Sequence, residues 1–146
     1  ILMRETPCAL NVSSIAEEIK LSRATTMNYI KYLKDSRLIN LLYLENKNFP
    51  MKPSKVFMQN TNLAQMLTTK ELSNQELYET CFYASIHGSH KLNATERSAM
   101  FIVDGKYYFD VRETTPQRDT IRPTAIGTLE TGRGNMIPLW LLGFLY

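Results

Sequence analysis

Three acidic residues in the second half of the chain are the best candidates for metal-dependent chemistry: Glu79, Asp104 and Asp110. Two carboxylates can hold a divalent metal ion, which activates a water molecule and stabilises the charge that develops when a phosphodiester is cleaved. That chemistry also needs a lysine two residues after the second acid, to orient the water. The chain has Arg112 at this position, and Met100 stands where a first-strand acid would be expected. We therefore interpret Glu79 and Asp110 as a vestigial nuclease site, with no catalytic residue and no bound metal.

The elements that carry these acids are a helix and a hairpin. Apolar residues at helical spacing predict a helix over residues 75–86. Asp104-Gly105 lies between two apolar runs and predicts a type I′ turn, with residues 100–103 paired to residues 106–109. Residues 124–129 predict a further strand. A helix followed by a hairpin with an acid on its second strand is the outline of a PD-(D/E)xK nuclease core, so we expect residues 69–146 to be a degenerate restriction-endonuclease-like domain.

The first half of the chain predicts two short helices with a tight turn between them. Ser22 is a good N-cap, and Met27, Ile30 and Leu33 then recur on one apolar stripe. Upstream, the sequence from Ser14 to Glu17 fits a capping box and predicts a helix over residues 15–19. This pattern is typical of a helix-turn-helix.

Two candidate strands, residues 38–44 and 55–59, follow the second helix and predict a hairpin with a polar loop. A helix-turn-helix followed by a hairpin is a winged helix, which we place at residues 1–68. A further short helix is expected over residues 61–67, with Asn60 or Thr61 as its cap. The complete chain is therefore expected to be α+β.

A DNA-reading winged helix places the start of its second helix in the major groove. The expected DNA-binding residues lie in that helix and in the hairpin loop: Arg23, Thr25, Thr26, Asn28, Lys31, Lys34, Lys47 and Lys52. The first four of these would meet base edges, and the lysines would lie near phosphates. Many such modules instead join other domains, because a fold does not determine a function. A protein-interaction module therefore remains an alternative.

The charge of the 146-residue chain is unevenly distributed. Up to Lys55 there are nine Lys or Arg against five Asp or Glu, and the remainder has eight against nine. The basic surplus thus falls on the half expected to contact nucleic acid. Cys8 and Cys81 lack metal-type partner spacing and predict free thiols in a reducing compartment. We expect a cytoplasmic protein, because no secretory signal opens the chain and the apolar run at residues 137–146 is too short to span a membrane.

Several segments, in this order, resemble a known family: LSRATTMNYIKYLKDSRLINLL (21–42), KVFMQNTNLAQML (55–67), YETCF (78–82), FIVDGKYYFDV (101–111) and IPLWLLGFLY (137–146). Together they resemble the C-terminal region of bacterial and archaeal AAA-type P-loop ATPases, in which a winged helix and a nuclease-like domain of unknown function follow the ATPase module. The family commonly shows Asp-Phe at Met100-Phe101, Glu at Asp110 and Gly-Gly-Lys from Arg112 onward.

The resemblance implies that this chain is a fragment whose ATPase domain, with its ATP and Mg²⁺, lies upstream of Ile1. We expect no cofactor within the chain itself. The function that follows is a non-catalytic module of an AAA-type ATPase, which binds DNA or a protein partner through its winged helix. The alternatives are a metal-dependent nuclease domain that uses Glu79 and Asp110, and a purely structural interaction domain.

Overall fold

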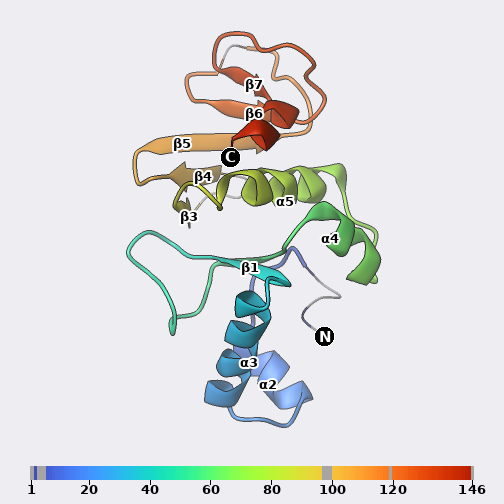
Figure 1. Cartoon of the computed structure of the whole chain (residues 1–146), viewed down its shortest axis with the longest axis vertical. Coiled ribbons are helices and arrows are strands. Elements are labelled where there is room, and N and C mark those ends of the chain that lie inside the picture. Colours follow the sequence, from blue (N-terminus) through green and yellow to red (C-terminus); the bar gives the residue numbers. More distant parts are fainter. Residues whose placement is uncertain (1, 3–5, 97–99, 119, 146) are drawn as a thin grey trace. The chain divides into compact units, whose positions relative to one another are not determined.

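The computed structural model of this chain describes residues 2, 6–96, 100–118 and 120–145. The fold is mixed α+β, and the chain divides into two units, residues 1–71 and 72–146, each with its own helices and sheet (Figure 1). In the described part of the chain, no helix has the length and apolar character needed to cross a membrane.

In the first unit, α2 (Val12–Glu18) and α3 (Arg23–Asp35) are separated by a short turn. Ser22 caps α3 as predicted, because its hydroxyl accepts a hydrogen bond from the Thr25 amide at 3.1 Å. The predicted start of the first helix is wrong: the cap is Asn11, whose side chain accepts from the Ser14 amide. The helix begins one turn earlier because Val12 is buried and anchors that turn.

An antiparallel hairpin follows, formed by β1 (Ile39–Leu42) and β2 (Lys55–Met58), with Ile39 opposite Met58. Cys8 pairs with Val56 on the other edge of β2 through two backbone hydrogen bonds. The predicted helix over residues 61–67 is confirmed as α4 (Thr61–Leu67), with Asn60 as its cap. The core of the unit consists of fully buried side chains from all these elements, among them Leu10, Ile39, Val56, Phe57 and Ala64.

The second unit is built on a five-stranded sheet in the order β3 (Leu92–Ala94), β4 (Met100–Val103), β5 (Tyr107–Arg112), β6 (Thr124–Ile126) and β7 (Met136–Pro138). The pairs β3–β4 and β4–β5 are antiparallel, whereas the pairs β5–β6 and β6–β7 are parallel. The sequence did not predict β3 or β7, which have only three residues each. The predicted strand over residues 124–129 ends at Ile126, one residue before Gly127.

The helix α5 (Asn74–Ile86) covers one face of this sheet. It begins with a capping box formed by Ser73 and Glu76. The Phe82 ring is fully buried, with its centroid 4.9 Å from that of Phe101 and 5.6 Å from that of Phe109. The 3-10 helix η1 (Leu139–Phe144) packs beside α5 through its buried residues Leu139 and Leu142 (Figure 1).

The hairpin of β4 and β5 differs from its prediction by one residue. Asp104 and Gly105 both have positive φ, 54° and 66°, as a type I′ turn requires. The Lys106 amide, however, closes the turn by donating to the Val103 carbonyl at 3.1 Å, and pairing resumes with Val103 opposite Tyr107. The predicted partners 106–109 are therefore wrong, and the paired residues are 107–110. This shift places Met100 directly opposite Asp110.

Candidate nucleic-acid interface

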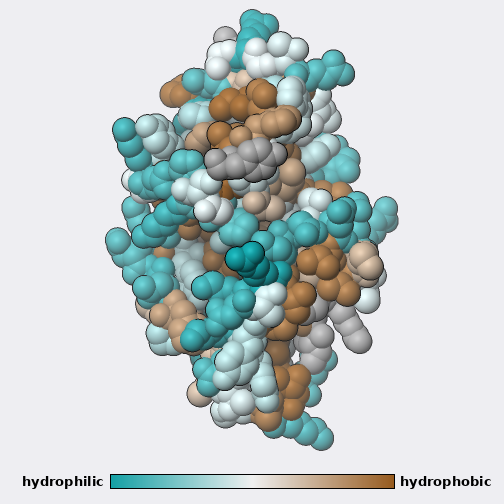
Figure 2. All heavy atoms as spheres, in the orientation of Figure 1, coloured by the Kyte–Doolittle hydropathy of each residue, from teal (hydrophilic) through white to brown (hydrophobic). Residues whose placement is uncertain are grey.

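The exposed side of α3 carries most of the residues predicted to contact DNA. Met27 and Ile30 are buried against the core, which leaves Arg23, Asn28 and Lys31 exposed on the rest of the helix, and Lys34 is also exposed near its end. Asp35, the last residue of the helix, is its single acid. The surface over α3 is largely hydrophilic or neutral in Figure 2. This helix side is therefore polar and predominantly basic.

The two threonines of α3 belong to its first turn rather than to this open surface. Thr25 is half-buried, and its hydroxyl oxygen lies 2.8 Å from that of Ser22. Thr26 is 1% exposed, and its hydroxyl donates to the Ser22 carbonyl at 3.0 Å. A base edge cannot reach Thr26, so the prediction that it contacts DNA needs correction. The buried threonine is compatible with a helix because its hydroxyl bonds back to the preceding turn.

The loop between β1 and β2 lies beside α3 and adds two exposed lysines, Lys47 and Lys52. The contact between loop and helix is made by Phe49, whose half-buried ring has the Lys31 ammonium 5.6 Å from its centroid. In the described part of the chain, Arg23, Lys34, Lys47 and Lys52 form no ion pair with a carboxylate. Their charges therefore remain available to a ligand.

A groove of about 490 Å³ lies between α3 and the loop. It is lined by Arg23, Ala24, Met27, Asn28, Phe49 and Pro50. We call it the α3–Phe49 groove. Its walls combine an aromatic ring, a guanidinium group and a carboxamide, and none of its described lining residues is acidic.

Two exposed tyrosines complete this surface. Tyr29 and Tyr32 are 50% and 60% exposed, and their rings meet edge to face with centroids 6.2 Å apart. The predicted site residues did not include Tyr29, Tyr32 or Phe49. The tyrosines could have been found, because they lie outside the apolar stripe of the helix. Phe49 gave no such signal, since its position depends on how the loop folds back onto α3.

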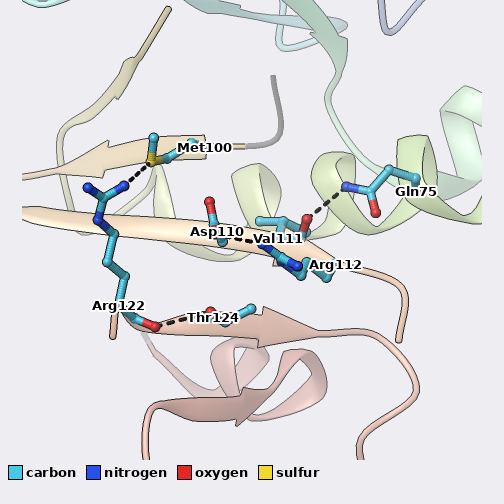
Figure 3. A network of polar contacts seen from close by, with 7 residues as sticks. All are labelled: Gln75, Met100, Asp110, Val111, Arg112, Arg122 and Thr124. Atoms are coloured by element: carbon cyan, nitrogen blue, oxygen red, sulfur yellow. Dashed lines mark hydrogen bonds and ion pairs between the residues drawn. The ribbon is translucent and has the colours of Figure 1, made fainter. Parts of the chain in front are cut away.

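In the second unit, Glu79 lies on the side of the sheet that α5 covers. It is 3% exposed, and its carboxylate accepts a hydrogen bond from Gln75 at 3.2 Å. The same Gln75 amide group donates to the Val111 carbonyl at 2.8 Å and so ties α5 to β5 (Figure 3). Glu79 is thus part of a buried polar contact between a helix and a strand.

Asp110 lies on the opposite side of the sheet. The Phe109 ring contacts Phe82 of α5, and successive side chains of a strand point to opposite faces, so Asp110 and Arg112 point away from α5. Arg112 lies 3.4 Å from the Asp110 carboxylate (Figure 3). The two predicted nuclease acids are therefore not brought together.

Arg122 covers the same outer face beside Asp110. Its guanidinium donates to the Met100 sulfur at 3.4 Å (Figure 3). The same guanidinium lies 5.9 Å from the centre of the Tyr108 ring. Met100 is the residue that stands where the sequence analysis expected a first-strand acid. Among the described residues, no group of three or more His, Cys, Asp or Glu side chains is placed to hold a metal ion.

A third polar contact joins the end of α5 to the turn of the hairpin. The Nδ1 of His90 lies 2.7 Å from the Asp104 carboxylate, whose other oxygen accepts from the Lys91 amide at 2.9 Å. The hydrogen bonds from His90 and Lys91 hold the pKa of the Asp104 carboxyl below its usual range. Beside this pair is an apolar cavity of about 340 Å³, lined mainly by Ile86, Val103, Phe109 and Leu142 among others.

No protein-family model, no curated protein and no solved structure matches this chain.

Proposed function

We propose that the first unit is a winged-helix DNA-binding module in which α3 is the recognition helix and the β1–β2 loop is the wing. The observation that supports this proposal best is the unpaired positive charge of α3 and the loop. Arg23, Lys34, Lys47 and Lys52 have no carboxylate partner among the described residues, and Lys31 packs on the loop through Phe49. Phosphate contacts supply essentially all of non-specific DNA binding and need such groups.

In this proposal the residues have separate roles. Arg23, Asn28 and the half-buried Thr25 lie in the first two turns of α3, from which a recognition helix reads base edges. Lys31, Lys34, Lys47 and Lys52 contact phosphates and position the module without reading sequence. Thr26 has no role in the contact because it is buried.

The test is a titration of a fluorescently labelled duplex at low and moderate salt. We expect an affinity of roughly 10⁻⁴–10⁻⁶ M at physiological salt, which weakens as the salt concentration rises. Lys31→Glu combined with Lys34→Glu should weaken binding at least about tenfold, because it reverses two charges that face the phosphates.

The matched control is Lys91→Glu with Lys106→Glu, which changes the total charge equally but alters exposed lysines of the second unit. This variant should bind as the parent does, apart from a small general effect of charge. Absence of binding at low salt, or equal loss in both double variants, would overturn the proposal.

We further propose that the second unit has a degenerate nuclease-like fold and is non-catalytic. The placement of Glu79 and Asp110 on opposite sides of the sheet supports this, since two acids must converge on one metal ion to activate water. Plasmid nicking by the purified chain with Mg²⁺ or Mn²⁺ tests it. Cleavage that disappears in Asp110→Asn would establish the nuclease alternative instead.

The similarity to AAA-type ATPases supports a third proposal, that an ATPase domain precedes this chain in the complete protein and is its partner. Gene sequence upstream of Ile1 tests this directly. A P-loop motif followed by this chain is the expected result, and a different upstream domain would exclude the link.

A protein partner is the second candidate function, and η1 provides the observation in its favour. Trp140 and Phe144 are 54% and 66% exposed, with their rings in edge-to-face contact at 6.2 Å. Exposed aromatic side chains are enriched where proteins bind one another. If the duplex titration shows no binding, an interaction module becomes the better description of this chain.

A further inference from the structure

The α3–Phe49 groove has a different chemical character from the remainder of the basic surface. Phosphate contacts need only exposed cations, as at Lys34, Lys47 and Lys52. The groove instead combines apolar lining residues, Met27, Phe49 and Pro50, with two polar ones, Arg23 and Asn28. Apolar and aromatic lining with a few polar groups is the general character of a small-ligand site, and the Phe49 ring offers a planar group a surface to stack on.

The Phe49 ring both contacts α3 and lines the groove. The Lys31 ammonium lies over the ring, 5.6 Å from its centroid. The ring also lines the groove together with Pro50, and so presents an apolar surface to a ligand there. Every nucleobase has a π face that can stack on such a ring, so stacking does not depend on which base is present.

The polar groups of the groove match the remainder of a nucleotide. The Asn28 carboxamide has both a donor and an acceptor and can pair with the hydrogen-bonding edge of a base, adenine above all. The Arg23 guanidinium, which would face base edges in a fully paired duplex, is suited to the phosphate of an unpaired nucleotide in the groove. None of the described lining residues carries a negative charge that would repel it.

We propose that the α3–Phe49 groove binds an unpaired nucleobase of a DNA strand. This inference rests on the proposed DNA-binding function and specifies its substrate: duplex DNA next to an overhang, bulge or single-stranded tract. A base inside a duplex is stacked on both faces and cannot enter the groove, whereas an unpaired base can stack on Phe49. Phosphates of the neighbouring duplex then contact the lysines of α3 and the loop.

The test compares two duplexes of equal length, one fully paired and one with a single-stranded overhang that carries 2-aminopurine. We expect the complete chain to bind the overhang duplex at least about tenfold more tightly, the scale of one base–aromatic stack. We also expect a saturable change in 2-aminopurine fluorescence. Phe49→Ala should abolish this change and the preference, and should leave the affinity for the fully paired duplex within about twofold of the parent.

Met51→Ala is the matched control, because Met51 is exposed in the same loop and does not line the groove. It should keep the preference and the fluorescence change. Asn28→Asp is the second variant: it alters an exposed side chain on α3 rather than loop packing, and its carboxylate would repel the phosphate. It should also lose the preference, and it decides the question if circular dichroism shows that Phe49→Ala is unfolded.

The outcomes separate the two proposals. Binding to neither duplex at low salt would overturn the proposed function and this inference with it. Equal binding to both duplexes, or a preference that survives both Phe49→Ala and Asn28→Asp, would overturn the inference alone and leave duplex binding by α3 intact.

Discussion

The basic surface of the first unit and three acids of the second unit differ in whether they have a partner within the described chain. Around α3, four cationic side chains have no carboxylate partner in the described chain. In the second unit, Glu79 is bonded to Gln75, Asp110 to Arg112 and Asp104 to His90. Charged groups that are hydrogen-bonded or paired within a chain act mainly on its folding, whereas charged groups without such a partner can act on a ligand. Substitutions in the two regions should therefore have separable effects on stability and on DNA binding.

The largest expected effect is on the core of the second unit. Phe82→Ala removes a fully buried ring between Phe101 and Phe109 and should lower the free energy of unfolding by about 3–5 kcal/mol. Phe144→Ala, at an exposed position, should change it by less than about 0.5 kcal/mol. Urea denaturation measures both. If Phe82→Ala weakened DNA binding under conditions where the chain is folded, the proposed separation would be wrong.

A steric change at Gly127 should have the next largest effect. A Cβ atom at this position would lie 2.3 Å from the Tyr78 ring of α5, so Gly127→Ala must displace the ring or the strand. We expect a loss of about 1–3 kcal/mol in the free energy of unfolding, as for other overpacked sites. Gly88→Ala has no atom within 4 Å of the added carbon and is the control. Equal losses in the two variants would contradict the close approach of Tyr78.

The buried threonine of α3 gives a smaller effect and tests the boundary of the DNA surface. Thr26→Val removes the hydrogen bond to the Ser22 carbonyl, which keeps its bond from the Thr26 amide. The free energy of unfolding should fall by roughly 0.5 kcal/mol, the low end for a neutral hydrogen bond. DNA affinity should stay within about twofold of the parent, whereas Asn28→Ala should reduce it. A larger loss of affinity in Thr26→Val would show that Thr26 does contribute to DNA binding.

The smallest expected effect concerns acid sensitivity at the hairpin turn. Because His90 and Lys91 hold the pKa of the Asp104 carboxyl below its usual range, the charged form stabilises the fold. This contribution is complete above about pH 4, the ordinary aspartate value, and is lost as the pH falls through the lower folded pKa. Asp104→Asn tolerates the positive φ of 54° and removes the titrating group.

Urea denaturation from pH 7 to pH 3 measures this contribution. The difference in unfolding free energy between the parent and Asp104→Asn should be small at pH 7 and should decrease toward pH 3. A difference that is constant across this range would show that the carboxylate contributes nothing to the pH dependence.

Local structure was predicted well where one short stretch of sequence decides it. Ser22 was predicted as a cap because a hydroxyl just before an apolar helical stripe can accept a hydrogen bond from a free backbone amide of the first turn. The positive φ angles of Asp104 and Gly105 follow from the low cost of that conformation for these two residue types. The register of the same hairpin was missed by one residue, because it depends on how Phe101 and Phe109 pack together under Phe82.

The sequence by itself determined α3, α4 and α5, the Asp104-Gly105 turn and the concentration of positive charge in the first half of the chain. Tertiary structure alone decided which of these residues meet. It separated Glu79 from Asp110, because the packing of α5 decides which face of the sheet is covered, and Asp110 points to the other face. It also brought Phe49 to α3, because the path of a loop is set by packing between residues distant in sequence. Such contacts leave no signal in the sequence, because the two partners are far apart along the chain and belong to no common helical or strand repeat.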